Sequence, residues 1–219
     1  MSALQSNFRR ACVLGVALAM SSPVLTYAAP HAHEAAAPAV SKAAATQDAL
    51  RDLWIGHVFW VRNVVTATLA DDTAAATAAE KEVVANAKAI AGAIEPFYGK
   101  AASEKLFGLL AGHYGAIKDY LTATKANRVP AQEAALGKLT SNANEIAVFL
   151  SGANPNLPVD TLRGLLTAHG GHHVQQIQQL HTKQYAEEAR TWDAMKNHMY
   201  VIADALTNAI AKQFPEKFR

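Results

Sequence analysis

The chain has 219 residues, of which 51% are hydrophobic and 17% charged, and its 20 basic and 18 acidic residues give a formal net charge of +2. A balance this close to neutral provides no electrostatic footprint for nucleic acid or an anionic membrane surface, which argues against both partners. The single cysteine, Cys12, excludes a disulfide framework and haem attachment through a Cys-x-x-Cys-His motif.

Residues 1–28 have the pattern of a secretory signal peptide. Arg9 and Arg10 form a basic segment, an apolar stretch follows from Cys12 to Met20, and small residues precede an expected cleavage after Ala28. Removal of this segment leaves 18 basic and 18 acidic residues, so the mature chain is neutral and has no thiol. We therefore expect a periplasmic or secreted protein.

Residues 29–45 are rich in alanine and proline and can bury little, which predicts a flexible tether. Residues 46–219 are expected to form one domain, with Thr46 and either Asp72 or Thr73 as helix N-caps and Pro96 ending the second helix. The expected helices span about 47–70, 73–94, 99–126, 130–151, 159–182 and 184–214. No period-2 strand pattern occurs and the connections are short, so the sequence predicts an all-α, up-and-down antiparallel bundle of five to six helices. No later apolar run is long enough to span a membrane.

Three histidines lie on the apolar stripes of three different expected helices. His57 lies among apolar residues at the 3, 4, 3, 4 spacing of one helix face, and His113 and His169 repeat this arrangement. The first, third and fifth helices of an up-and-down bundle run in the same direction. At ~1.5 Å of rise per residue the three imidazoles should lie at a similar height and converge.

Convergent imidazoles in a helical bundle indicate a transition-metal site, with copper or zinc preferred to iron. The candidate ligands are the three core histidines together with His173, which shares a helix face with His169, and with Glu145, His198 and Met199. Because imidazoles bind metal only when neutral, ordinary histidine pKa values would weaken binding between pH 7.5 and 5.

Several segments resemble a group of bacterial exported all-helical proteins that has no settled biochemical role. The shared motifs are His-Val-x-Trp-x-Arg from His57, Asn-Ala-x-x-Ile-Ala-x-Phe-Leu from Asn142 before an Asn-Pro turn, and a C-terminal Gln-Phe-Pro-x-x-Phe. The resemblance extends over nearly the whole mature chain and implies a helical bundle. His172 and His173 depart from it, so the resemblance implies that this pair is peripheral to the main function.

Three functions remain open from the sequence. The preferred one is non-catalytic binding of a transition metal through core histidines. The second is an envelope stress or interaction protein in which the histidines form a purely structural hydrogen-bond network with Asn and acidic partners. The third is an enzyme with a mononuclear histidine-metal site, which is the weakest because no acid or nucleophile accompanies the histidines at a diagnostic spacing.

Overall fold

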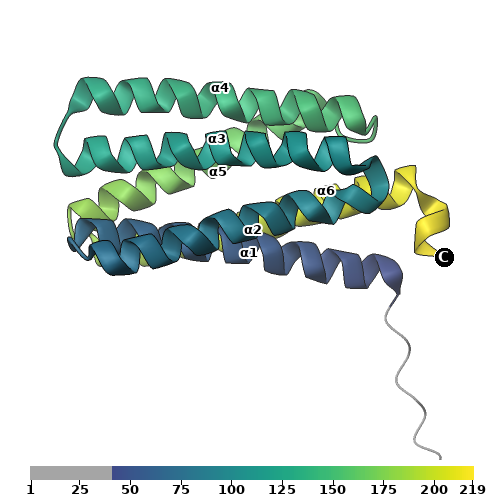
Figure 1. The fold of residues 1–219 in the computed structure, drawn as a ribbon, viewed down its shortest axis with the longest axis horizontal. Coiled ribbons are helices and arrows are strands. Elements are labelled where there is room, and N and C mark those ends of the chain that lie inside the picture. The colour runs from purple at the N-terminus through teal and green to yellow at the C-terminus, as the bar shows by residue number, and fades with distance from the viewer. Residues whose placement is uncertain (1–40) are drawn as a thin grey trace, which may run out of the picture. The chain divides into compact units, whose positions relative to one another are not determined.

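A computed structural model describes residues 41–219, which form six long helices and a short 3₁₀ turn (Figure 1). The expected signal peptide and most of the expected tether lie outside the described residues. No strand occurs within 41–219, and the predicted all-α bundle is confirmed. The elements are α1 (Lys42–Leu69), α2 (Thr73–Tyr98), α3 (Lys100–Lys125), α4 (Val129–Ala153), α5 (Val159–His181), α6 (Tyr185–Gln213) and η1 (Pro215–Phe218).

The helices alternate in direction, so that α1, α3 and α5 run one way and α2, α4 and α6 the other (Figure 1). The three turns at one end of the bundle have the same construction. Asp71, Asn127 and Lys183 have positive φ angles of 61°, 53° and 59°. The amide of the residue that follows each one donates to a carbonyl five residues back, which is the αL helix ending that reverses the chain within a few residues.

Two expected helix boundaries are wrong. Helix α1 begins at Lys42, because Ser41 caps it by accepting a 3.2 Å hydrogen bond from the amide of Ala44. Residues 42–45, which were expected in the tether, are therefore helical. Pro96 does not end α2 but lies within its last turn. The helix continues to Tyr98 and ends at Gly99, whose φ of 82° favours glycine.

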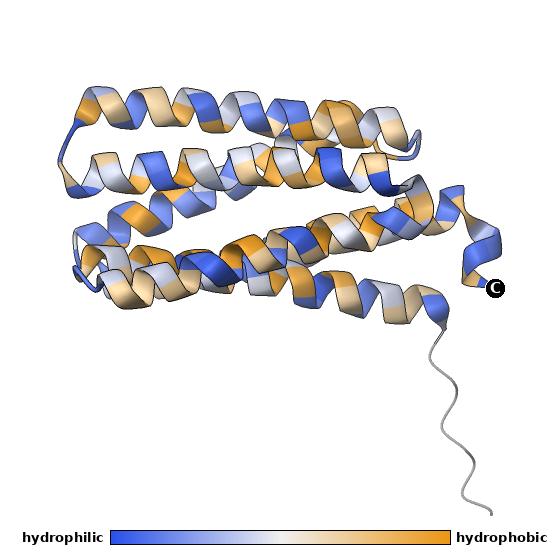
Figure 2. Cartoon of the chain, in the orientation of Figure 1, coloured by the Kyte–Doolittle hydropathy of each residue, from blue (hydrophilic) through white to orange (hydrophobic). Residues whose placement is uncertain are grey.

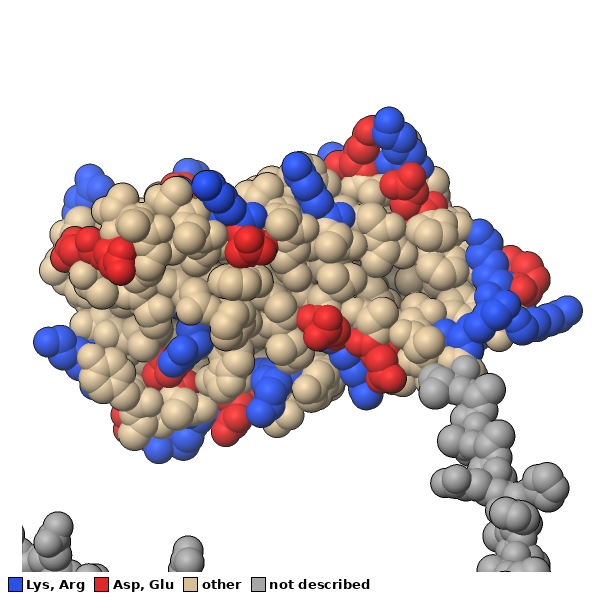
Figure 3. Space-filling model, turned by 60° about the horizontal axis from the view of Figure 1, so that its bottom comes forward, with Lys and Arg blue, Asp and Glu red and all other residues tan. Residues whose placement is uncertain are grey.

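Successive helices pack against each other, and α6 also packs against α1, while α5 contacts both α1 and α3. Helices α1, α3 and α5 therefore carry the residues closest to the centre of the domain. Figure 2 shows apolar and polar positions alternating along every helix, as amphipathic helices require. On the face shown in Figure 3, acidic and basic side chains are interspersed without a large patch of one sign, consistent with the near-neutral composition.

The described part of the chain, residues 41–219, contains no helix that is both long and apolar enough to cross a membrane.

The domain contains a threefold repeat of a helical hairpin with a period of 56 residues. The core histidines His57, His113 and His169 are 56 residues apart, and so are the three positive-φ residues of the turns. The second helices of the hairpins repeat as well, with Ile90, Ile146 and Ile202 buried at equivalent positions. The sequence-based interpretation missed this repeat, although the spacing of the three histidines would have revealed it.

Two adjacent glycines of α5 have different roles, which gives a test of the packing. A Cβ atom on Gly170 would lie 3.2 Å from Leu139 Cδ2 of α4, whereas one on Gly171 would meet nothing within 4 Å. We expect Gly171→Ala to raise the free energy of unfolding by about 1 kcal/mol, because alanine favours a helix. Gly170→Ala should lose that gain and be destabilised by up to about 2 kcal/mol through crowding of Leu139. Urea unfolding of both variants measures the difference, and equal stabilities would contradict the close contact between α4 and α5.

Candidate metal centre

Each core histidine is held by the same local arrangement. Four residues before it, a leucine carbonyl accepts a hydrogen bond from the second helix of the same hairpin. The donors are Asn86 Nδ2 to Leu53 at 2.9 Å, Asn142 Nδ2 to Leu109 at 3.0 Å and His198 Nε2 to Leu165 at 2.8 Å. These three bonds fix the turns that precede His57, His113 and His169, so the histidines occupy equivalent positions.

The structure brings four histidines together at the centre of the bundle. His57, His113, His169 and His173 each offer a ring nitrogen, and these four atoms all lie within 4.8 Å of one another. Four ligand atoms bound tetrahedrally at ~2.0–2.1 Å lie ~3.4 Å from one another, so side-chain movements of up to about 1 Å would bring these nitrogens around one ion. The expected convergence of His57, His113 and His169 is confirmed, and the group is compatible with a metal ion.

The imidazoles of the group have almost no hydrogen-bond partners. All four side chains are buried, with exposures of 1–5%. Seven of their ring nitrogens, namely His57 Nε2 and both nitrogens of His113, His169 and His173, are buried without a partner. Because unpaired buried polar atoms cost about 1–3 kcal/mol each, a purely structural network would be expected to pair them. The arrangement differs from a hydrogen-bonded network and is compatible with a metal site.

Burial keeps these imidazoles neutral. Desolvation, helped by the neighbouring His113, lowers the pKa of His57 to about 3. The pKa of His113 is lowered to about 4 by desolvation, which the nearby Asn142 side chain partly offsets. Desolvation and the adjacent histidines also lower the pKa values of His169 and His173 well below the ordinary range. The group is therefore in its metal-binding, neutral form at any pH near 7.

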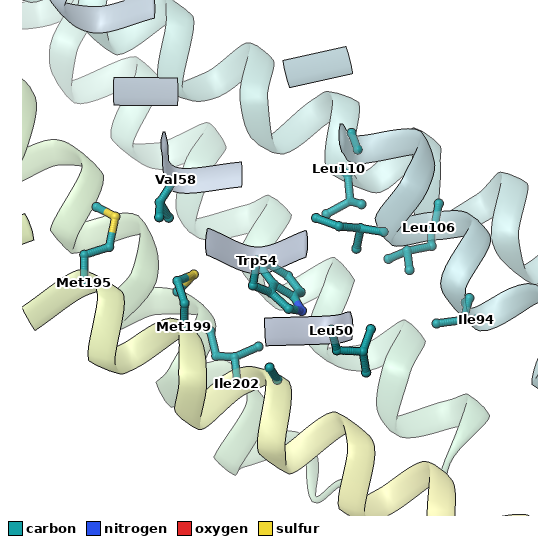
Figure 4. Packing of buried hydrophobic residues seen from close by; sticks show 13 residues of the cluster. Leu50, Trp54, Val58, Ile94, Leu106, Leu110, Met195, Met199 and Ile202 are labelled. Carbon is teal, nitrogen blue, oxygen red and sulfur yellow. The ribbon is translucent and has the colours of Figure 1, made fainter. Parts of the chain in front are cut away.

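Three other residues predicted as ligands lie elsewhere. Glu145 is exposed and accepts a 3.3 Å hydrogen bond from Ser141, because it points outward from α4. His198 uses Nε2 to hold the Leu165 carbonyl, as the equivalent of Asn86 and Asn142 in the third hairpin. Met199 packs in an apolar cluster beside Trp54 and Ile202 (Figure 4).

The prediction that His172 and His173 are both peripheral is wrong for His173. One turn after His169, His173 faces the centre of the bundle, and the two ring centroids are 4.5 Å apart. Its equivalents in the other hairpins are the apolar residues Val61 and Ile117, so only the third hairpin supplies a second imidazole. His172 is half-buried and contacts His198, with ring centroids 5.5 Å apart.

His172 and His173 provide a matched pair of variants. We expect His173→Ala to weaken metal binding by more than the ~10–100-fold that loss of an outer-shell partner costs, because it removes one of the four convergent imidazoles. His172→Ala should leave the affinity within a few-fold. Competition titrations with a chromogenic chelator measure both values, and a stronger effect of His172→Ala would place the centre at a different site.

The buried acid Glu188 of α6 belongs to an ion pair and not to the histidine group. Arg62 makes a bidentate pair with Glu188, at 2.6 and 2.8 Å, and Gln176 Nε2 donates to the same carboxylate at 2.9 Å. Asp204 pairs instead with Arg51. Glu188 is buried, and its pKa is lowered chiefly by the hydrogen bonds from Arg62.

The fold and the site define a helical bundle with a central four-histidine group. The chain matches no protein-family model, no curated protein and no solved structure.

Proposed function

We propose that this protein is an exported, non-catalytic transition-metal binder that holds one ion with His57, His113, His169 and His173. The observation that supports this most strongly is that four buried histidines each bring one ring nitrogen within 4.8 Å of the others, while seven of their ring nitrogens have no hydrogen-bond partner. Neutral imidazole is a good ligand for copper, zinc, iron and nickel. Export rests on the signal-peptide pattern of residues 1–28, and the resemblance to exported helical proteins agrees with it.

The charge balance of the site favours copper, in its singly charged state, over zinc. Four neutral imidazoles do not offset the charge of a bound ion, and the one buried carboxylate among residues 41–219, Glu188, is already paired with Arg62. The cost of burying an ion in a medium of low dielectric constant grows with the square of its charge. Burying Cu⁺ in this site therefore costs less free energy than burying Zn²⁺. Zinc has no singly charged form that could take its place.

A non-catalytic role fits the surroundings of the group. A hydrolytic metal centre needs an acid, a base or a nucleophile beside the metal-bound position. Among the described residues, the histidine group is accompanied by apolar and aromatic side chains, including Trp54, whose ring lies 6.1 Å from that of His57. The structural alternative, an envelope stress or interaction protein, would require partners for the ring nitrogens.

Metal analysis of the native protein tests this proposal. The untagged protein, purified from the periplasm without chelators, should contain about one copper ion per chain by mass spectrometry. His113→Ala should lose the metal, whereas His181→Ala should keep it, because His181 lies outside the group beside Asn127. A metal-free wild type, even after incubation with Cu⁺ and Zn²⁺, would overturn the proposal.

A further inference from the structure

An apolar cavity adjoins the histidine group on one side only. It is lined by His57, His113 and His169 together with 15 other residues, but not by His173. Every lining residue of α1, α3 and α5 is one of these histidines or precedes it in the chain, whereas His173 follows His169 by one turn. Because the three helices run in the same direction, the cavity and His173 lie on opposite sides of the layer formed by the three equivalent histidines.

The cavity is narrow and elongated. About 40 Å³ is open to the centre of a water molecule, compared with the ~10–15 Å³ that one water needs. From His57 to Leu50 along α1 it extends over about 10 Å, at ~1.5 Å per residue. Its walls repeat with the hairpins, since Trp54, Leu110 and Leu166 occupy equivalent positions.

The polar atoms that reach this space are few. Besides the histidines, the lining contains the indole of Trp54 and the phenol of Tyr98. The Tyr98 hydroxyl already donates to Gln213 and accepts from Asn154. Trp54 Nε1 is buried without a partner, and Figure 4 shows it on the side of the ring that faces Leu50, which also lines the cavity.

We infer that this cavity binds a small neutral molecule of the size of a diatomic gas, such as carbon monoxide, nitric oxide or dioxygen. The molecule would lie on the side of the histidine group opposite His173. It would bind Cu⁺ in place of one of the four imidazoles, because a Cu⁺ ion takes no more than four such ligands, and this part of the inference rests on the proposed copper site. An apolar lining keeps such a space dry and favours apolar occupants over water. A space of about 40 Å³ holds roughly three water-sized groups, which excludes ligands of many atoms, and the unpaired Trp54 N–H is a donor available to an oxygen atom in the cavity.

An ionised ligand does not fit this space. The cavity-lining residues include no cationic Lys or Arg side chain, and an unpaired charge buried among leucines and isoleucines costs several kcal/mol. The carboxylate of a fatty acid would find no hydrogen-bond partner at either end of the cavity, because the Tyr98 hydroxyl already bonds to Gln213 and Asn154. The neutral diatomic ligand is therefore the occupant that the lining favours.

Xenon tests the cavity without any metal. Metal-free wild type should bind about one xenon atom, detected by ¹²⁹Xe NMR and by shifts of methyl signals from Leu110 and Leu166. Leu166→Phe and Leu110→Phe should each reduce xenon binding more than tenfold by filling the space. Leu180→Phe, on the same helix as Leu166 but outside the cavity, is the matched control and should bind xenon as the wild type does. A wild type that binds no xenon would overturn the inference.

Carbon monoxide tests the link to the metal. The Cu⁺-loaded wild type and Leu180→Phe should show one C–O stretching band in the infrared, and Leu166→Phe should lose it while retaining its copper. Trp54→Phe should keep the band but shift it, because the N–H donor is gone. Equal bands in wild type, Leu166→Phe and Leu110→Phe would overturn the inference and leave copper binding intact. Xenon binding by a protein that takes up no copper would instead support the cavity and overturn the proposed function.

Discussion

The metal-free protein should unfold cooperatively as the pH falls from 6.5 to about 4.5. In the unfolded chain the four core histidines accept protons near a pKa of 6.5, but in the folded protein the pKa of His57 is lowered to about 3 and that of His113 to about 4. The unfolded state therefore binds more protons than the native state below pH 6.5. Stability is complete above that value and is lost as the pH falls toward the folded pKa values.

The size of this effect is comparable with the stability of a domain. His57 and His113 each contribute about 1.4 kcal/mol per pH unit, so together they contribute about 5 kcal/mol between pH 6.5 and 4.5, and the lowered pKa values of His169 and His173 act in the same direction. Whole domains are stable by only 5–15 kcal/mol. Circular dichroism during an acid titration measures the transition, which should move to lower pH when copper is bound. A metal-free protein that remains folded at pH 4 would contradict the burial of four neutral imidazoles.

The same pKa values correct the expectation that metal affinity falls between pH 7.5 and 5. That expectation assumed ordinary imidazoles, but the lowered pKa values of His57 and His113 leave the native ligands neutral at pH 5. We now expect the affinity of the folded protein to change little over this range. Its loss should coincide with acid unfolding rather than with titration near pH 6.5.

The second large effect is that His57→Leu should change the stability of the metal-free protein and of the metal-loaded protein in opposite directions. Leucine has a similar volume and removes a buried ring nitrogen that has no partner. At pH 7.5 the metal-free variant should therefore be as stable as the wild type, or more stable by about 1–3 kcal/mol. The wild type alone should gain about 2.7 kcal/mol from metal at one hundred times its dissociation constant.

Thermal unfolding with a chelator and with Cu⁺ separates the two effects. His181→Leu is the control, because His181 is outside the histidine group, and its response to copper should equal that of the wild type. A loss of about 1–3 kcal/mol in metal-free His57→Leu would indicate that the imidazole has a structural hydrogen-bond role. A wild type whose melting temperature does not respond to copper or zinc would contradict metal binding.

Much of the fold and three of the four histidines of the site follow from local patterns in the sequence. The apolar stripes around His57, His113 and His169 predict both the helices and the direction in which these histidines point, because the helix period fixes both. Short turns then determine that the three helices are parallel. The start of α1 was misplaced because its N-cap, Ser41, lies in a low-complexity segment. The end of α2 was misplaced because the helix tolerates Pro96 in its last turn.

Whether each of the other candidate ligands reaches the site depends on the rotation of its helix, which the spacing within one helix does not specify. Glu145 and Asn142 are three residues apart on α4, yet Asn142 faces the core and Glu145 faces solvent. His198 is a poor candidate for a ligand once the 56-residue repeat is recognised, since Asn86 and Asn142 occupy the equivalent positions. The repeat also identifies His173 as an imidazole at a position that is apolar in the other two hairpins.

X-ray absorption spectroscopy of the copper-loaded protein tests the four-histidine centre most directly. The spectrum should show only nitrogen ligands in the first shell, at ~2.0 Å, with the outer-shell scattering of imidazole rings. His173→Ala should lower the imidazole contribution, and His172→Ala should leave it unchanged. A sulfur ligand, which would implicate Met199, or a first shell without imidazole would contradict the account.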